Sequence, residues 1–304
     1  MSITSFPRFL RFALTGSLFL VGAVPVLAQG TALDQMESCL VTVIPMGKQA
    51  LDQLLRPVYD SVQITAENEK KVGAVLYEEI AQHHPGAMDV DSLDLNYIRA
   101  VGQRVSKGAD RRDVQYTFHL IEKPKVNAFA HCGGHVYIYR GLLKALHNEA
   151  QLASVLGHEI SHVDLGHTNG ALKALLLSER IQGVLPLVTL DFADFLALSA
   201  QAALNGLYNE ALEMDADEAG LKLAFRSGYD PSEGARYWKE NPDTNRGQGR
   251  LDRLGHAVMR SHPSALRRAE AADAYAAGLK KGYVGPELVI GEKSFRQRNM
   301  VAAR

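Results

Sequence analysis

The stretch NEAQLASVLGHEISHVDLG, residues 148–166, decides how the rest of this chain is interpreted. Its apolar residues recur at steps of three and four, as one buried helix face requires. These residues are Leu152, Val155, Leu156, Ile160 and Val163. Asn148 suits the N-cap of such a helix and Gly166 suits its end. Because residues four apart share a helix face, His158 and His162 are predicted to lie side by side.

These two histidines and the intervening Glu159 form the pattern HExxH, which is typical of zinc peptidases. Both imidazoles can reach one metal ion, and Glu159 can reach a water molecule beside it. An amphipathic helix with surface histidines is the alternative. Catalytic zinc usually takes three protein ligands, so the functional interpretation requires a third ligand from elsewhere in the chain.

The composition is that of a globular protein with a sizeable core, apart from the N-terminus. The chain has 304 residues, of which 46% are hydrophobic and 22% charged, and its net charge of −1 gives no reason to expect nucleic acid as a partner. Arg8 and Arg11 precede an apolar run over residues 12–27. Residues 1–28 are therefore predicted to be a secretory signal peptide, with an uncleaved membrane anchor as the alternative.

The remaining sequence predicts an α+β fold that is mostly helical. Residues 29–82 and 95–105 place apolar side chains at helical steps. Residues 114–121, 126–130 and 135–139 alternate in the manner of strands. We therefore expect a small antiparallel or mixed sheet beside the helix that carries HExxH.

Another helix is predicted at residues 208–225, where Glu213 and Asp217 are four residues apart. Both carboxylates can face one metal ion. On composition alone, solvated acids in an acid-rich helix are the simpler interpretation. The preceding apolar segment, residues 171–207, is consistent either with core helices or with a mobile or membrane-facing lid.

Taken together, several segments make this chain resemble the family-forty-eight zinc metallopeptidases, in their soluble periplasmic branch. They follow the order of the family's motifs and span about residues 60–280. The segments are Asn127–Ala130 with Gly133-Gly134, Tyr139–Leu143, Asn148–His167, Glu213–Asp217, and Ser261–Pro263 with Arg268.

The resemblance implies a role for each of several side chains. Glu213, the first residue of the family's ExxAD pattern, would be the third ligand of one zinc ion per chain. Asp217 would hold a ligating histidine in place. His262 would donate to the oxyanion of the transition state, with a histidine at a helix start as the alternative. His167 is one residue too early for the third histidine of a metzincin, so a structural role is expected for it.

The resemblance also implies a zincin-like metallopeptidase domain at residues 29–280. Its parts would be N-terminal helices at 29–110, a small sheet at 111–145 and the zinc-site helices at 146–280, followed by a C-terminal tail at 281–304. The strand at residues 135–139 is expected to bind substrate as an added strand, through its backbone. In that strand, one face would hold His135, Tyr137 and Tyr139, and the other Val136 and Ile138.

The expected function is that of a zinc-dependent endopeptidase, with Glu159 as general base, which cleaves unfolded, damaged or misassembled envelope proteins in the periplasm. A non-catalytic, zinc-stabilised chaperone or assembly factor is the alternative. Peripheral contact with a membrane is left open. So is a disulfide between Cys39 and Cys132. A regulatory alternative makes one further side chain a fourth zinc ligand at rest. The candidates are His131, Cys132, His135 and His256.

Overall fold

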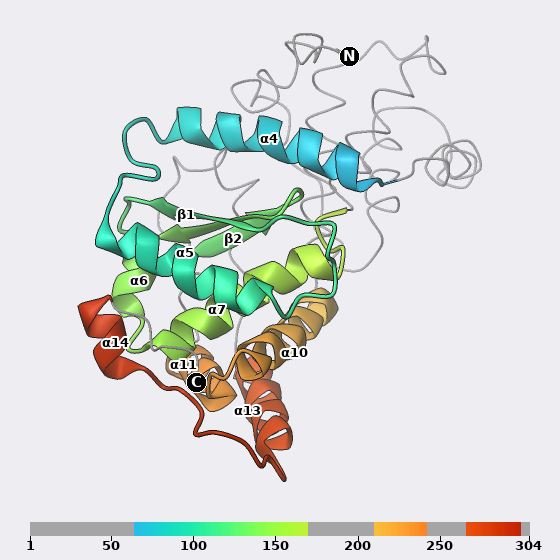
Figure 1. Ribbon diagram of the computed structural model, residues 1–304, viewed down its shortest axis with the longest axis vertical. Coiled ribbons are helices and arrows are strands. Elements are labelled where there is room, and N and C mark those ends of the chain that lie inside the picture. The colour runs from blue at the N-terminus through green and yellow to red at the C-terminus, as the bar shows by residue number, and fades with distance from the viewer. Residues whose placement is uncertain (1–63, 170–209, 242–265, 299–304) are drawn as a thin grey trace, which may run out of the picture. The chain divides into compact units, whose positions relative to one another are not determined.

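The described residues include a three-stranded sheet with helices on both of its faces (Figure 1). The computed structural model describes residues 64–169, 210–241 and 266–298. Its strands are β1 (Thr117–Ile121), β2 (Ala128–His131) and β3 (His135–Tyr139), in the order β1-β3-β2. β3 pairs with β1 in parallel and with β2 in antiparallel fashion. The sheet is therefore mixed, and the predicted α+β class is confirmed.

One face of the sheet is polar and aromatic, and α4 (Ala66–His83) covers it (Figure 1). The ring of Tyr77 from α4 stacks on His135, with ring centroids 5.6 Å apart. His135 in turn accepts or donates a hydrogen bond through Nδ1 to the Thr117 hydroxyl, at 3.0 Å. The predicted alternation in β3 is thus confirmed, because His135 and Val136 point to opposite faces.

The opposite face of the sheet forms the main hydrophobic core with α5 (Leu93–Ser106) and α7 (Glu149–Asp164). The sheet contributes Phe118, Leu120, Val136 and Ile138, all at most 2% exposed. The Asn148 side chain caps α7 by accepting a hydrogen bond from the Gln151 backbone N–H at 2.9 Å. α7 is buried along almost its whole length, and its buried residues include polar ones such as Glu149, His158 and Glu159.

On the far side of α7 lie α10 (Glu210–Arg226), α11 (Pro231–Glu240) and α13 (Leu266–Lys280). α10 ends at Arg226, within one residue of the predicted end. Pro231 is the first residue of α11, where a missing N–H costs nothing. Among the residues that the structure describes, none of the helices is both long and apolar enough to span a membrane.

Two glycines allow α7 and α10 to cross in close contact. A methyl group on Gly157 would lie 2.5 Å from the Gly220 carbonyl oxygen, and one on Gly220 would lie 2.5 Å from the His158 backbone nitrogen. Both distances are shorter than any side chain tolerates. The crossing therefore requires glycine in both helices, and it brings the HExxH helix against the helix that carries Glu213.

The C-terminal residues do not form the expected tail. The backbone N–H of Glu149 donates to the Gly291 carbonyl, and that of Ala150 donates to the Ile290 carbonyl at 3.0 Å. α14 (Glu292–Gln297) follows, and Phe295 is buried in the main core. The first N–H groups of a helix lack partners within that helix, and here the C-terminal segment supplies them with acceptors. This packing has no periodic signal in the sequence.

Several sequence predictions concern residues outside the described part of the chain. They are the signal peptide at 1–28, the apolar segment 171–207, and the roles given to Cys39, His256 and His262. Cys132 is a buried free cysteine, and burial raises the pKa of its thiol to about 12.

Replacing Gly220 with alanine is expected to force α10 away from α7. Overpacking of this kind destabilises a protein by about 1–3 kcal/mol, which chemical denaturation measures. Gly278→Ala is the matched control, because Gly278 lies in α13 with no atom within 4 Å of an added methyl group. That control should stabilise the protein by up to about 1 kcal/mol. If Gly220→Ala and Gly278→Ala changed the free energy of unfolding equally, the close crossing of α7 and α10 would be refuted.

Acid should weaken the contact between α4 and the sheet. Burial, and then the neighbouring His119, lower the pKa of His135 from 6.5 to about 4. Between these two pH values the unfolded chain binds a proton that the folded chain does not, so stability falls as the pH falls. The loss should reach about 1.4 kcal/mol per pH unit. The groups that face His135 are Tyr77 from α4, Thr117 and His119 from β1, and His131 from β2.

This pH dependence can be measured by urea denaturation at a series of pH values. His135→Gln should flatten the slope between pH 6.5 and 4. The exposed His147, replaced in the same way, should leave the slope as it is in the wild type. If His135→Gln and the wild type showed the same slope of stability against pH, the lowered pKa assigned to His135 would be contradicted.

Candidate metal centre

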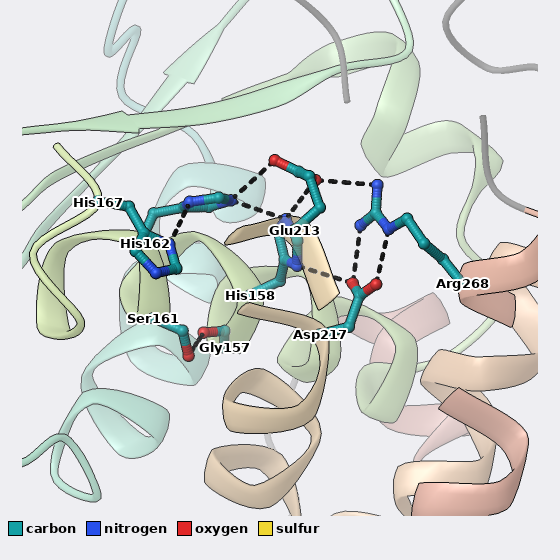
Figure 2. A network of polar contacts seen from close by, with 8 residues as sticks. All are labelled: Gly157, His158, Ser161, His162, His167, Glu213, Asp217 and Arg268. Carbon is teal, nitrogen blue, oxygen red and sulfur yellow. Dashed lines mark hydrogen bonds and ion pairs between the residues drawn. The ribbon is translucent and has the colours of Figure 1, made fainter. Parts of the chain in front are cut away.

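α7 and α10 bring His158, His162 and Glu213 together in one buried cluster (Figure 2). The Nε2 atoms of the two histidines are 3.1 Å apart. Glu213 Oε2 lies 3.6 Å from His158 Nε2, and Oε1 lies 3.4 Å from His162 Nε2. Two ring nitrogens and a carboxylate oxygen at these separations can all reach one ion at ordinary zinc–ligand distances.

Each histidine is held in position through its other ring nitrogen. Asp217 Oδ1 lies 2.9 Å from His158 Nδ1, so the carboxylate accepts from this nitrogen when it carries the proton. His167 Nδ1 lies 3.1 Å from His162 Nδ1 (Figure 2). Both contacts leave Nε2 as the atom directed at the cluster. Such contacts fix the tautomer and the ring orientation of ligating histidines.

Arg268 of α13 ties the two carboxylates of α10 together (Figure 2). Its Nε and Nη2 donate to the two oxygens of Asp217, at 2.7 and 2.8 Å. Its Nη1 lies 2.9 Å from Glu213 Oε2. Burial by itself raises the pKa of the Asp217 carboxyl, but Arg268 and His158 together hold that pKa below its ordinary value. Asp217 is therefore a carboxylate, and an acceptor, over the neutral pH range.

The donor set and the burial of this cluster suit a divalent cation. Glu159, Glu213 and Asp217 are at most 3% exposed, and Arg268 is 6% exposed. Two imidazole nitrogens and one carboxylate oxygen are the kinds of donor that catalytic zinc takes from a protein.

The strand expected to bind substrate is wrongly assigned. β3 (His135–Tyr139) is the central strand, so β1 occupies one of its edges and β2 the other. Its backbone groups are already paired, and an added strand has no place there. The sequence identified the strand but did not reveal the strand order, because the order depends on contacts between residues distant in the sequence.

The regulatory alternative receives no support from the residues that the structure describes. Within them, the group of side chains able to share one metal ion consists of His158, His162 and Glu213. His131 instead contacts the Tyr137 hydroxyl at 3.0 Å. His135 lies with it on the sheet face that α4 covers. His256 lies outside the described residues.

The sequence did not reveal the contacts that Arg268 and His167 make at the site. Arg268 belongs to a matched segment, but nothing local in the sequence signals that it reaches two carboxylates on another helix. His167 was expected to be structural, and its contact with His162 shows what it holds. Its position five residues after His162, just beyond the Gly166 turn, is the signal that was available.

A helix that presents two histidines four residues apart, completed by a glutamate from a second helix, defines a metallopeptidase-type site. The chain belongs to Peptidase family M48, whose family model matches residues 92–276. The family membership predicted from sequence is therefore confirmed.

Relatives of known identity include bacterial and mitochondrial proteases. The chain is 31% identical over 172 residues to the Beta-barrel assembly-enhancing protease of Yersinia pestis, covering 51% of this chain and 34% of the relative. For the protein of the same name from Escherichia coli K12, identity is 30% over 183 residues, covering 57% and 37%. The mitochondrial Metalloendopeptidase OMA1 of Bos taurus is 29% identical over 174 residues, covering 53% and 32%. The match thus spans about a third of each of these relatives.

Replacing Arg268 with lysine should weaken metal binding, since lysine keeps the charge but cannot bridge Glu213 and Asp217 together. Changes to groups that orient metal ligands typically cost about 10–100-fold in affinity. Competition with a chromophoric zinc chelator measures this directly. Arg99→Lys, at a half-exposed arginine of α5, is the control and should bind zinc as the wild type does. An unchanged affinity in Arg268→Lys would show that the bridge does not support the site.

Proposed function

We propose that this protein is a zinc-dependent endopeptidase that cleaves unfolded, damaged or misassembled proteins of the cell envelope. The convergence of His158, His162 and Glu213 on one point carries the proposal. A structural zinc site has no need of a general base, whereas here Glu159 adjoins His158 on the same helix and is buried. Membership of Peptidase family M48 supports the same reaction class.

One zinc ion per chain is the proposed cofactor, with His158, His162 and Glu213 as its ligands. Imidazole and carboxylate donors in a three-ligand set are characteristic of catalytic zinc. When bound, zinc supplies Lewis acidity that makes a water acidic and polarises a carbonyl. The nitrogen donors favour zinc over magnesium or calcium.

The protein's own residues would divide the remaining work. The Glu159 carboxylate would take a proton from the attacking water and later deliver it to the leaving amine nitrogen. Asp217 and His167 would keep the two imidazoles oriented, and Arg268 would hold the Glu213 carboxylate. We retain His262 as the proposed donor to the oxyanion, on the basis of its position in the sequence motif.

For substrate binding we propose the edge strand β2 in place of β3. Within the described residues, Asp89 N–H donates to the Leu120 carbonyl on the outer edge of β1, and Glu122 N–H, just after β1, donates to the Ala87 carbonyl. β2 forms its strand pairing only with β3. β2 also packs against α7. A substrate chain added to β2 would therefore run beside the HExxH helix, held by backbone hydrogen bonds that tolerate many side chains.

Asn127, the residue before β2, supports this arrangement. Its side chain is 4% exposed, and its Nδ2 has no hydrogen-bond partner within the described part of the chain. A buried amide donor without an acceptor is costly, so it is suited to a carbonyl supplied by a ligand. We propose that it receives a backbone carbonyl of the bound substrate.

We propose the cell envelope as the place of action because the sequence predicts a signal peptide and because of the names of the relatives. Two of these relatives are named for the assembly of β-barrels. On that basis we propose that misassembled proteins are among the substrates of this protein. Backbone recognition of an extended chain suits substrates that have lost their fold. We also propose that the protein makes peripheral contact with a membrane.

Two substitutions test the catalytic assignments. Glu159→Gln should retain zinc and lose nearly all cleavage of unfolded casein, because general-base catalysis contributes about 10²–10⁴-fold. Glu213→Ala should lose zinc as well, measured by elemental analysis. Glu218→Ala is the matched control, since Glu218 is an exposed acid of the same helix. Normal zinc content in Glu213→Ala would show that Glu213 is not a zinc ligand. Normal turnover in Glu159→Gln would show that Glu159 is not the general base.

The same assay separates the enzyme from a zinc-stabilised chaperone. A protease should cleave denatured envelope proteins, and a chelator should stop the cleavage. A chaperone should suppress their aggregation without cleavage, and Glu159→Gln should leave that suppression unchanged. Cleavage that requires both zinc and Glu159 would exclude the chaperone as the main function.

A further inference from the structure

A row of four ring side chains runs through the candidate metal centre. His158 and His162 meet edge to face, with ring centroids 4.8 Å apart and ring planes at 81°. His167 follows His162 in the row, at 5.1 Å and 68°. Trp238 of α11 forms the opposite end, because its ring lies 5.9 Å from that of His158 at 60°. All three contacts have the tilted geometry that aromatic pairs prefer over a face-to-face sandwich.

Trp238, the only tryptophan of the chain, is itself held in place by several helices. It is partly buried, and it packs against the main core and against a second, smaller cluster of apolar residues. That cluster comes from α10, α11 and α13 and consists of Leu221, Ala235, Ala272 and Ala276. A large ring whose own position is set by packing can restrain the side chain beside it.

The ring of His158 has one movement that its carboxylate contact does not restrict. Asp217 Oδ1 lies 2.9 Å from Nδ1, which sets the direction of that nitrogen but allows the ring to turn about the line joining the two atoms. The ring of His162 is restrained against such turning by two neighbours, His158 and His167. Trp238 gives His158 a second ring neighbour in the same way.

We propose that Trp238 is a positioning residue of the metal centre, whose indole fixes the plane of the His158 ring. Nε2 of His158 lies 3.1 Å from that of His162 and 3.6 Å from Glu213 Oε2, so a turn of the His158 ring would change both separations. Trp238 therefore acts on the metal through His158. The inference rests on the proposed function, because it takes His158 as a zinc ligand.

Zinc affinity distinguishes positioning from simple packing. Trp238→Leu removes the ring and should weaken zinc binding about threefold to tenfold, as competition with a chromophoric chelator measures, because a tilted aromatic contact contributes that much. Trp238→Phe retains a ring and should restore the affinity to within about twofold of the wild type. The matched control is Tyr275→Leu in α13, since Tyr275 is also partly buried and packs against the same small cluster. Tyr275→Leu should lower the unfolding midpoint as Trp238→Leu does, and it should leave the zinc affinity unchanged.

A spectroscopic measurement on the wild-type protein tests the same contact without any variant. The emission belongs to Trp238 alone, because the chain has a single tryptophan. One equivalent of Co²⁺ should quench this emission, whereas Zn²⁺, with its filled d shell, should not. The visible absorption band of bound Co²⁺, which reports ligand geometry, should shift in Trp238→Leu and stay unchanged in Tyr275→Leu.

Three results would overturn the inference. The first is equal zinc affinity of Trp238→Leu and the wild type. The second is an equal loss of affinity in Tyr275→Leu, which would mean that both changes act through stability. The third is bound Co²⁺ without quenching, which decides the matter even if Trp238→Leu does not fold. A wild-type protein that binds neither Zn²⁺ nor Co²⁺ would refute the proposed function itself, and with it this inference.

Discussion

Burial of like charge between α7, α10 and α13 is the constraint on which the remainder of this structure depends. Glu213 and Asp217 lie one turn apart and are almost fully buried, so each repels the other. Arg268 offsets this repulsion by binding both. The same packing brings the two imidazoles and Glu213 to one point, where they can hold a metal ion.

The helix that carries HExxH is held at its N-terminal end and near its middle. At its N-terminal end, the buried Glu149 accepts hydrogen bonds from the Tyr97 hydroxyl at 2.6 Å and from the Tyr229 hydroxyl at 2.8 Å. Further along, the Gly157–Gly220 crossing presses α10 against it. Reactive groups are positioned more accurately on such elements than on loops. This packing explains how the three ligand atoms are held close together.

Local sequence determined the HExxH helix, its Asn148 cap and the three strands, because periodicity, capping and ligand spacing act over a few neighbouring residues. Glu213 was identified as the third ligand only through the family resemblance. Tertiary structure alone decided the strand order, which places β2 and not β3 at an edge of the sheet within the described residues. It also decided that Arg268 bridges two carboxylates 51 and 55 residues earlier in the sequence, and that Phe295 joins the core. These features depend on contacts between distant segments. No local pattern encodes such contacts, since they form only when the complete set of buried surfaces and charges is satisfied at once.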